Sequence, residues 1–82
     1  MTTISVTQDD INRGERRSSM QCPIALACRR AGLGNVIVGY TYIKIGGIAV
    51  HFSGDVYHWL MDYDFPKKNQ EDSKPFEFEL DI

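Results

Sequence analysis

Two cysteines and two histidines are the side chains of this 82-residue chain that bind zinc most readily. Cys22 and Cys28 are separated by five residues, whereas cysteines of structural zinc sites are separated by two to four. On a helix they would lie about 9 Å apart along the axis and point to different sides. His51 and His58 fall on outward faces of other elements. We therefore predict no metal, no cofactor and no disulfide, with Cys28 in the core and Cys22 half-buried.

Nucleophilic catalysis is the second chemistry that the cysteines could support. Cys22 precedes a predicted helix, and Arg16 and Arg17 are near it in sequence; both features lower a thiol pKa. However, no histidine base is brought to Cys22 by any spacing in the chain. Asp62 and Asp64 form a pair of carboxylates, but no second catalytic group accompanies them. We therefore predict that the protein is not an enzyme and has no catalytic residues.

The charges are distributed unevenly along the chain. Residues 1–34 carry five arginines against three acids, a balance of +2, and residues 35–82 carry four lysines against eight acids, a balance of −4. The net charge of −2 excludes a strongly cationic nucleic-acid binder. The acidic part indicates a surface that meets a basic protein. The alternative is phosphate binding by the arginine cluster, which consists of Arg13, Arg16, Arg17, Arg29 and Arg30.

The last seven residues give the sharpest candidate for a binding surface. Apolar residues alternate with Glu77, Glu79 and Asp81 from residue 76 to residue 82. Since a strand sends alternate side chains to opposite faces, the three carboxylates form an outward row with neighbours about 6.7 Å apart. Asp62 and Asp64 would extend this surface if the preceding helix ends nearby. The competing explanation is that the charges protect an exposed strand edge from pairing.

Two helices and a hairpin are expected to position these side chains. A helix near residues 22–31 starts at Pro23 and ends before Gly32. A second helix near residues 54–63 follows Ser53 and buries Trp59 and Tyr63 on its apolar stripe. Between them, Gly46-Gly47 forms a two-residue turn that pairs residues 41–45 with 48–52. Thr7 and Asp10 form a capping box for an additional helical turn.

The sequence predicts a single α+β domain over residues 1–82. We expect a small, mainly antiparallel sheet in the order β-α-β-β-α-β, with both helices packed on one face. The first strand covers residues 2–6 and the last lies near residues 76–81. The predicted core contains the following residues: Ile4, Val6, Ile24, Cys28, Ile43, Val50, Trp59, Leu60, Phe76 and Phe78.

The chain lacks the signals of membrane insertion and secretion. No apolar run approaches the ~18 residues of a membrane span. The first four residues contain neither a basic nor an apolar segment typical of a secretory signal. Two cysteines are too few for a disulfide-framed scaffold. We therefore expect a cytoplasmic location and no membrane partner.

Five short motifs lie across nearly the whole chain: Ile4-x-Val6, Asp9-Asp10-Ile11-x-x-Gly14, Cys22-Pro23-Ile24-Ala25-Leu26-Ala27, Tyr63-Asp64 and Pro75-Phe76-x-Phe78-x-Leu80. In these motifs the chain resembles a family of small accessory proteins encoded by tailed phages and prophages. The Gly46-Gly47 turn and the loop after Pro66 fit less closely. The resemblance implies an infected bacterial cell as the setting and, by analogy with anti-CRISPR proteins, inhibition of a host or anti-phage nucleic-acid-processing complex. It supplies no functional residues.

Overall fold

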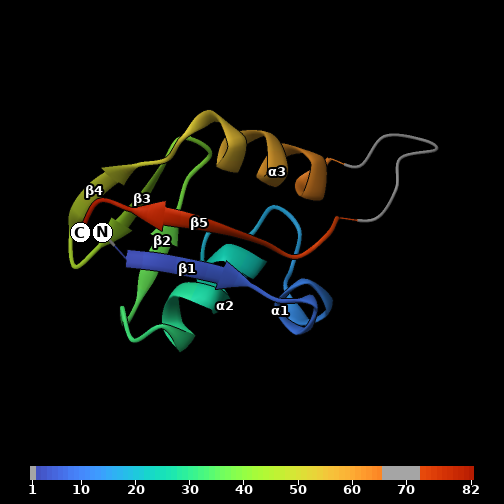
Figure 1. Cartoon of the computed structure of the whole chain (residues 1–82), viewed down its shortest axis with the longest axis horizontal. Helices are drawn as coiled ribbons and strands as arrows, with labels where there is room; N and C mark the ends of the chain where they lie inside the picture. The colour runs from blue at the N-terminus through green and yellow to red at the C-terminus, as the bar shows by residue number, and fades with distance from the viewer. Residues whose placement is uncertain (1, 66–72) are drawn as a thin grey trace.

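The computed structural model describes residues 2–65 and 73–82 and shows an α+β protein (Figure 1). The α+β class is confirmed, and the expected β-α-β-β-α-β order matches roughly, since residues 36–38 form a further strand before the hairpin. Along the chain the elements are β1 (Thr2–Val6), α1 (Gln8–Arg13), α2 (Pro23–Arg30), β2 (Val36–Val38), β3 (Tyr42–Ile45), β4 (Ile48–His51), α3 (Gly54–Asp64) and β5 (Phe76–Leu80).

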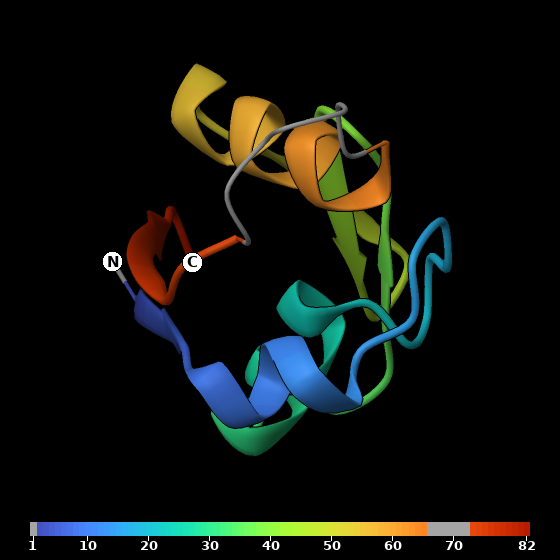
Figure 2. The same ribbon diagram turned by 90° about the vertical axis from the view of Figure 1, so that its right-hand side faces the viewer.

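The strands are divided between two antiparallel sheets. β1 pairs with β5, and β2, β3 and β4 form a three-stranded sheet in that order. Figure 2 shows the two sheets on opposite sides of the molecule, with α3 and the α1–α2 pair closing the gaps between them. This differs from the expected single sheet with both helices on one face. Alternating apolar residues determine which face of a strand is buried, but not which strand lies beside it.

Local capping signals set the start of each helix. The Thr7 hydroxyl accepts the backbone N–H of Asp10, while the Asp10 carboxylate accepts the N–H of Thr7, as the capping box predicts. Pro23 occupies the first turn of α2. Gly32 follows this helix with a φ of +90°, a conformation that favours glycine. Ser53 caps α3 by position only, since its side chain makes no capping bond.

The predicted hairpin register is confirmed. Gly46 and Gly47 both have positive φ, and Ile45 lies opposite Ile48 across the turn. Ile43 is fully buried, whereas the Ile48 side chain is 69% exposed. The hairpin tip therefore extends beyond the core, although the alternation of its side chains is as expected.

The core lies between the two sheets and the helices. Seven of the ten predicted core residues are buried, while Val50, Trp59 and Phe76 are only partly buried against the cluster. The Trp59 ring stacks on Phe76 with centroids 4.6 Å apart and on Tyr63 at 5.5 Å. Its indole N–H donates to the carbonyl of Lys74 at 2.9 Å. Trp59 therefore joins α3 to the segment that leads into β5.

Candidate interaction surface

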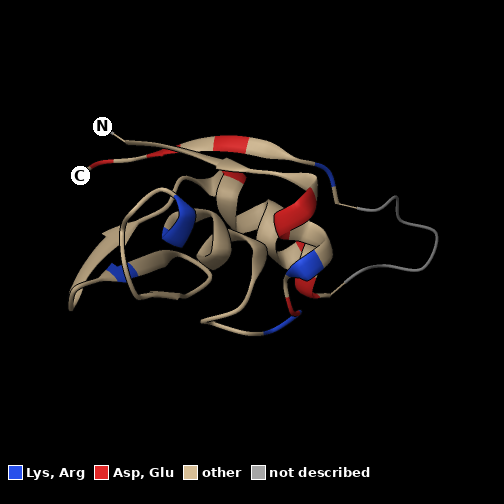
Figure 3. Ribbon diagram, turned by 90° about the horizontal axis from the view of Figure 1, so that it is seen from below, with Lys and Arg blue, Asp and Glu red and all other residues tan. Residues whose placement is uncertain are grey.

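The acidic row consists of Glu77 and Glu79 on β5 and Asp81 just after it. All three side chains are exposed, while Phe78 and Leu80 between them are buried. Glu77 lies opposite Ser5 of β1, and Glu79 lies opposite Thr3. Figure 3 shows acidic positions along the outer ribbon formed by these two strands. The β1–β5 ribbon therefore presents carboxylates on one strand and small hydroxyl side chains on the other.

No described cation neutralises the acidic row. Residues 2–65 and 73–82 contain two ion pairs, Asp9–Arg13 and Asp10–Arg30, and neither includes a carboxylate of the row. Exposed carboxylates spaced along a strand repel one another weakly in water and attract a basic surface. The row is thus an electrostatic surface whose charge is not used within the described part of the fold.

The two other candidate carboxylates have different surroundings. Asp62 is exposed on the last turn of α3. In Figure 1 this helix ends on the side of the molecule where β5 begins, whereas the C-terminus lies on the other side. Asp64 is only 5% exposed, and its Oδ1 accepts the backbone N–H of Arg17 at 2.9 Å. The expectation that Asp64 extends the acidic surface is therefore wrong, because its carboxylate is turned inward to hold the loop after α1.

This contact fixes an unusual backbone conformation. Arg17 is the one non-glycine residue with positive φ in the described part of the chain, at +58°. A left-handed conformation costs about 1–2 kcal/mol for a residue with a Cβ. The hydrogen bond to the buried Asp64 carboxylate and the contact of the Arg17 guanidinium with the Phe65 ring, 5.8 Å from its centroid, offset that cost.

Each of the five arginines has a partner within the protein. Arg13 pairs with Asp9 at 3.2 Å, and Arg29 donates to the Met20 carbonyl. Arg30 binds the Asp10 carboxylate at 2.5 Å and the Ser5 carbonyl at 2.6 Å. In Figure 3 the basic positions lie apart from one another rather than in one patch. These contacts favour structural roles and count against the phosphate-binding alternative.

Both cysteines are buried as free thiols, which does not suit nucleophilic catalysis. Cys22 was expected to be half-buried but is 1% exposed, because this N-cap residue of α2 packs into the hydrophobic core. Its Sγ accepts the N–H of Ala25 at 3.4 Å, and burial raises its pKa. Burial also raises the pKa of Cys28 to about 12. Both thiols are therefore protonated at neutral pH.

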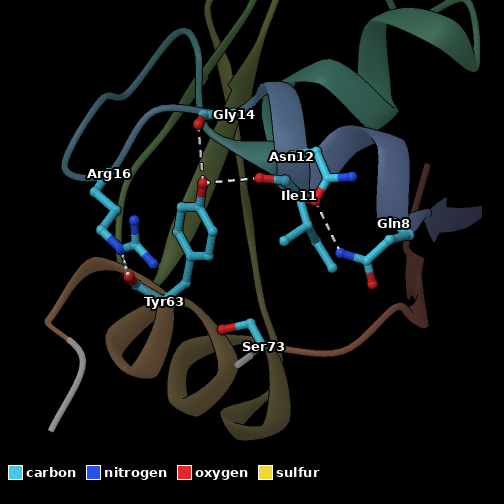
Figure 4. Close-up of a pocket in the computed structure, with 7 residues that line it drawn as sticks. All are labelled: Gln8, Ile11, Asn12, Gly14, Arg16, Tyr63 and Ser73. Atoms are coloured by element: carbon cyan, nitrogen blue, oxygen red, sulfur yellow. Dashed lines mark hydrogen bonds between the residues drawn. The ribbon is translucent and has the colours of Figure 1, made fainter. Parts of the chain in front are cut away.

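A cavity of about 270 Å³ lies between α1 and the end of α3 (Figure 4). At its wall, the Tyr63 hydroxyl lies 2.9 Å from the Gly14 carbonyl oxygen and 3.2 Å from that of Ile11. Arg16 donates through Nε to the Tyr63 carbonyl at 2.8 Å, and its guanidinium lies 4.9 Å from the centre of the Tyr63 ring. The polar groups of Tyr63 and Arg16 at the cavity wall therefore bond to the protein itself and connect the end of α3 to the end of α1.

Tyr63, Arg16 and Asp64 were not identified as a structural unit from sequence. Arg16 bonds to Tyr63, Asp64 to Arg17, and Tyr63 to Ile11. These contacts span 47 to 52 residues, so no local motif signals them. The apolar spacing of α3 indicated that Tyr63 is buried, which is confirmed. The apolar spacing does not indicate what the Tyr63 hydroxyl binds. Its partners are the carbonyls of Ile11 in α1 and of Gly14, which caps that helix.

The described residues contain neither a metal site nor a helix that could span a membrane. Residues 2–65 and 73–82 contain no group of three or more His, Cys, Asp or Glu side chains arranged to hold a metal ion. None of the helices in this part of the chain has the length and apolar character needed to cross a membrane.

No protein-family model, curated protein or solved structure matches the chain. The function must therefore be inferred from the surfaces of this chain.

Proposed function

We propose that this protein is a non-enzymatic binding protein that uses the acidic row to contact a protein with a basic surface. Glu77 and Glu79 of β5 and Asp81 just after it pair with no described cation, and this is the observation that supports the proposal. The strand fixes the backbone spacing of Glu77 and Glu79, so only their side chains must be ordered on binding. Complementary charge accelerates the encounter and makes it sensitive to salt.

The proposed partner is a protein or complex that processes nucleic acid in a bacterial cell, either a host factor or an anti-phage defence complex. Such a partner needs a basic groove for phosphates, and a row of carboxylates at regular intervals fits the same groove. The protein then inhibits by occupying the site of the nucleic acid. This proposal takes up the resemblance to phage accessory proteins, including anti-CRISPR proteins as a functional class.

The experiment is a capture assay with the immobilised protein in bacterial lysate, followed by mass spectrometry. Wild-type protein and the variant Glu77→Lys/Glu79→Lys/Asp81→Lys are compared, together with the control Asp9→Lys/Glu15→Lys/Asp55→Lys. Both variants change the net charge equally and alter only exposed side chains. We expect a captured protein that the control retains, that the row variant loses, and that double-stranded DNA or added salt displaces.

Two results would contradict the proposal. Equal loss in both variants would mean that net charge, rather than the position of the acidic row, governs capture. Retention by the row variant would assign the three carboxylates to protection of the strand edge. A salt-dependent gel shift of DNA or RNA by the purified protein would instead favour the arginine alternative.

A further inference from the structure

The free strand edges in the described part of the chain differ in how they are protected from pairing with another strand. The edge of β4 has no such protection among the described residues. On β2 the outward N–H of Val38 donates to the Ser19 carbonyl at 2.8 Å. On β1 the Ser5 carbonyl accepts a bond from Arg30. On β5, carboxylates alternate with apolar residues, and charge discourages the addition of another strand. β4 contains no Lys, Arg, Asp, Glu or Pro, and its sequence is Ile-Ala-Val-His.

The hydrogen-bond pattern of the hairpin shows which backbone groups of β4 face outward. Phe52 donates its N–H to Thr41, which makes these two residues a bonded pair. Bonded and non-bonded pairs alternate along an antiparallel ladder, so Val50 and Ile48 also bond to β3. The N–H and C=O groups of Ala49 and His51 consequently point away from β3, toward the free edge.

This arrangement is self-complementary about Val50. If a second copy of β4 lies antiparallel beside the first, Val50 faces its own counterpart across a two-fold axis. Ala49 of each copy then lies opposite His51 of the other. The N–H and C=O groups of Ala49 and His51 in one copy then bond to those of His51 and Ala49 in the other copy. All four outward groups of each strand are paired.

The side chains on this edge also suit a second copy. Ile48, the most exposed of the large apolar side chains on the described surface, would lie opposite Phe52 of the other copy. Phe52 is partly buried against the core, so the apolar inner face would continue across the axis. Beyond the two ends of β4, a Cβ at Gly46, Gly47 or Gly54 would meet no atom within 4 Å, so these positions leave room for a neighbouring strand.

We propose that the protein forms a symmetric dimer through antiparallel pairing of β4, which creates a six-stranded sheet in the order β2-β3-β4-β4-β3-β2. A second copy fits this edge because its outward groups pair completely about Val50, Ile48 meets Phe52 of the other copy, and no like charges face each other. The acidic row lies on the other sheet, across the core (Figure 2), so both rows stay exposed in the dimer. The dimer does not depend on the function proposed for that row.

Sedimentation equilibrium of the full chain from about 10 µM to about 1 mM tests the dimer over the affinity range of a small interface. We expect the apparent mass to rise from the 9.3 kDa of one chain toward twice that value. Ile48→Lys should raise the dimer dissociation constant at least tenfold. The matched control Ile37→Lys changes an isoleucine of the same sheet that is 45% exposed but lies two strands from the axis, and should leave the constant unchanged.

Amide hydrogen exchange in the wild-type protein identifies the edge directly. The amides of Ala49 and His51 should become protected as concentration rises. The amide of Val50 bonds to Ile43 within one chain and should be protected at every concentration. A constant mass of one chain up to about 1 mM would overturn the proposal. Equal effects of Ile48→Lys and Ile37→Lys, or Ala49 and His51 protection that is independent of concentration, would overturn it too.

Discussion

Arg16 and Tyr63 together connect the C-terminal ends of α1 and α3. The Arg16 Nε–H binds the Tyr63 carbonyl near the end of α3, and the guanidinium lies on the Tyr63 ring. The Tyr63 hydroxyl reaches the carbonyls of Ile11 and Gly14 at the end of α1 (Figure 4). The carbonyls at a helix C-terminus lack partners within the helix, so this contact satisfies groups on both helices.

Tyr63→Phe removes the hydroxyl and keeps the ring that stacks on Trp59. We expect a loss of about 1 kcal/mol in the free energy of unfolding, because the end of α1 loses its hydrogen bond. Urea denaturation measures the loss. The matched control Tyr57→Phe changes a half-buried tyrosine of the same helix whose hydroxyl bonds to no described residue. Equal stability of Tyr63→Phe and wild type would show that this hydroxyl does not stabilise the fold.

Gly14→Ala tests the close contact between the end of α1 and the start of α2. A Cβ on Gly14 would lie 2.6 Å from Cδ of the Pro23 ring, a rigid group that cannot move aside without the backbone. We expect a destabilisation of about 1–3 kcal/mol in thermal unfolding. Gly54→Ala, in the first turn of α3, meets nothing within 4 Å and should be neutral or stabilising by up to about 1 kcal/mol. The reverse ranking of the two variants would refute the packing described here.

Asp10 links the stability of the fold to pH. Burial alone would raise the pKa of Asp10, but bonds from Arg30 and Thr7 outweigh burial and hold the pKa below the ordinary 3.8. Because the folded-state pKa is lower than the unfolded-state pKa, the contribution is present above about pH 4 and is lost as pH falls through the folded value. Asp10→Asn should cost about 2 kcal/mol at pH 7 and far less near pH 2.

Urea titrations at a series of pH values measure this dependence. Asp9→Asn, at an exposed neighbouring carboxylate, serves as the control and should follow the wild-type pH profile closely. If Asp10→Asn had the same slope of stability against pH as wild type, the Arg30–Asp10 pair would not contribute to acid sensitivity.

Both thiols should be inert in the folded protein. Burial raises the pKa of Cys22, and it raises that of Cys28 to about 12, so the reactive thiolate is scarce and inaccessible at pH 8. Ellman's reagent should label two thiols per chain rapidly in urea and only slowly in native buffer. Rapid labelling of one thiol in the native state would place a reactive cysteine on the surface and contradict the burial of Cys22.

Local signals predicted the local structure well. The Gly46-Gly47 turn and the alternation around it specify the same hairpin register, and the Thr7–Asp10 capping box depends on a three-residue spacing. Helical periodicity does not apply to Cys22, which precedes the helix as its N-cap. Its burial results from packing in the core, which no local pattern shows.

The division into two sheets and the inward turn of Asp64 depend on contacts between distant parts of the chain. β1 and β5 pair across 70 to 78 residues, and Asp64 binds the backbone of Arg17 across 47. Alternation in β5 did place Glu77 and Glu79 on the outer face, which is confirmed. No local pattern could show that Asp64 is buried and accepts the Arg17 backbone N–H, since a carboxylate at the end of a helix is usually solvated.

The affinity of the purified partner for the acidic row is the most direct measurement of the central claim. Calorimetry compares wild type, Glu77→Lys/Glu79→Lys/Asp81→Lys and the charge-matched control with substitutions at Asp9, Glu15 and Asp55. We predict that the row variant folds normally, because its changed side chains are exposed, and binds at least tenfold more weakly, about 1.4 kcal/mol. The control should bind within a few-fold of wild type. An unchanged dissociation constant in the row variant would contradict the claim.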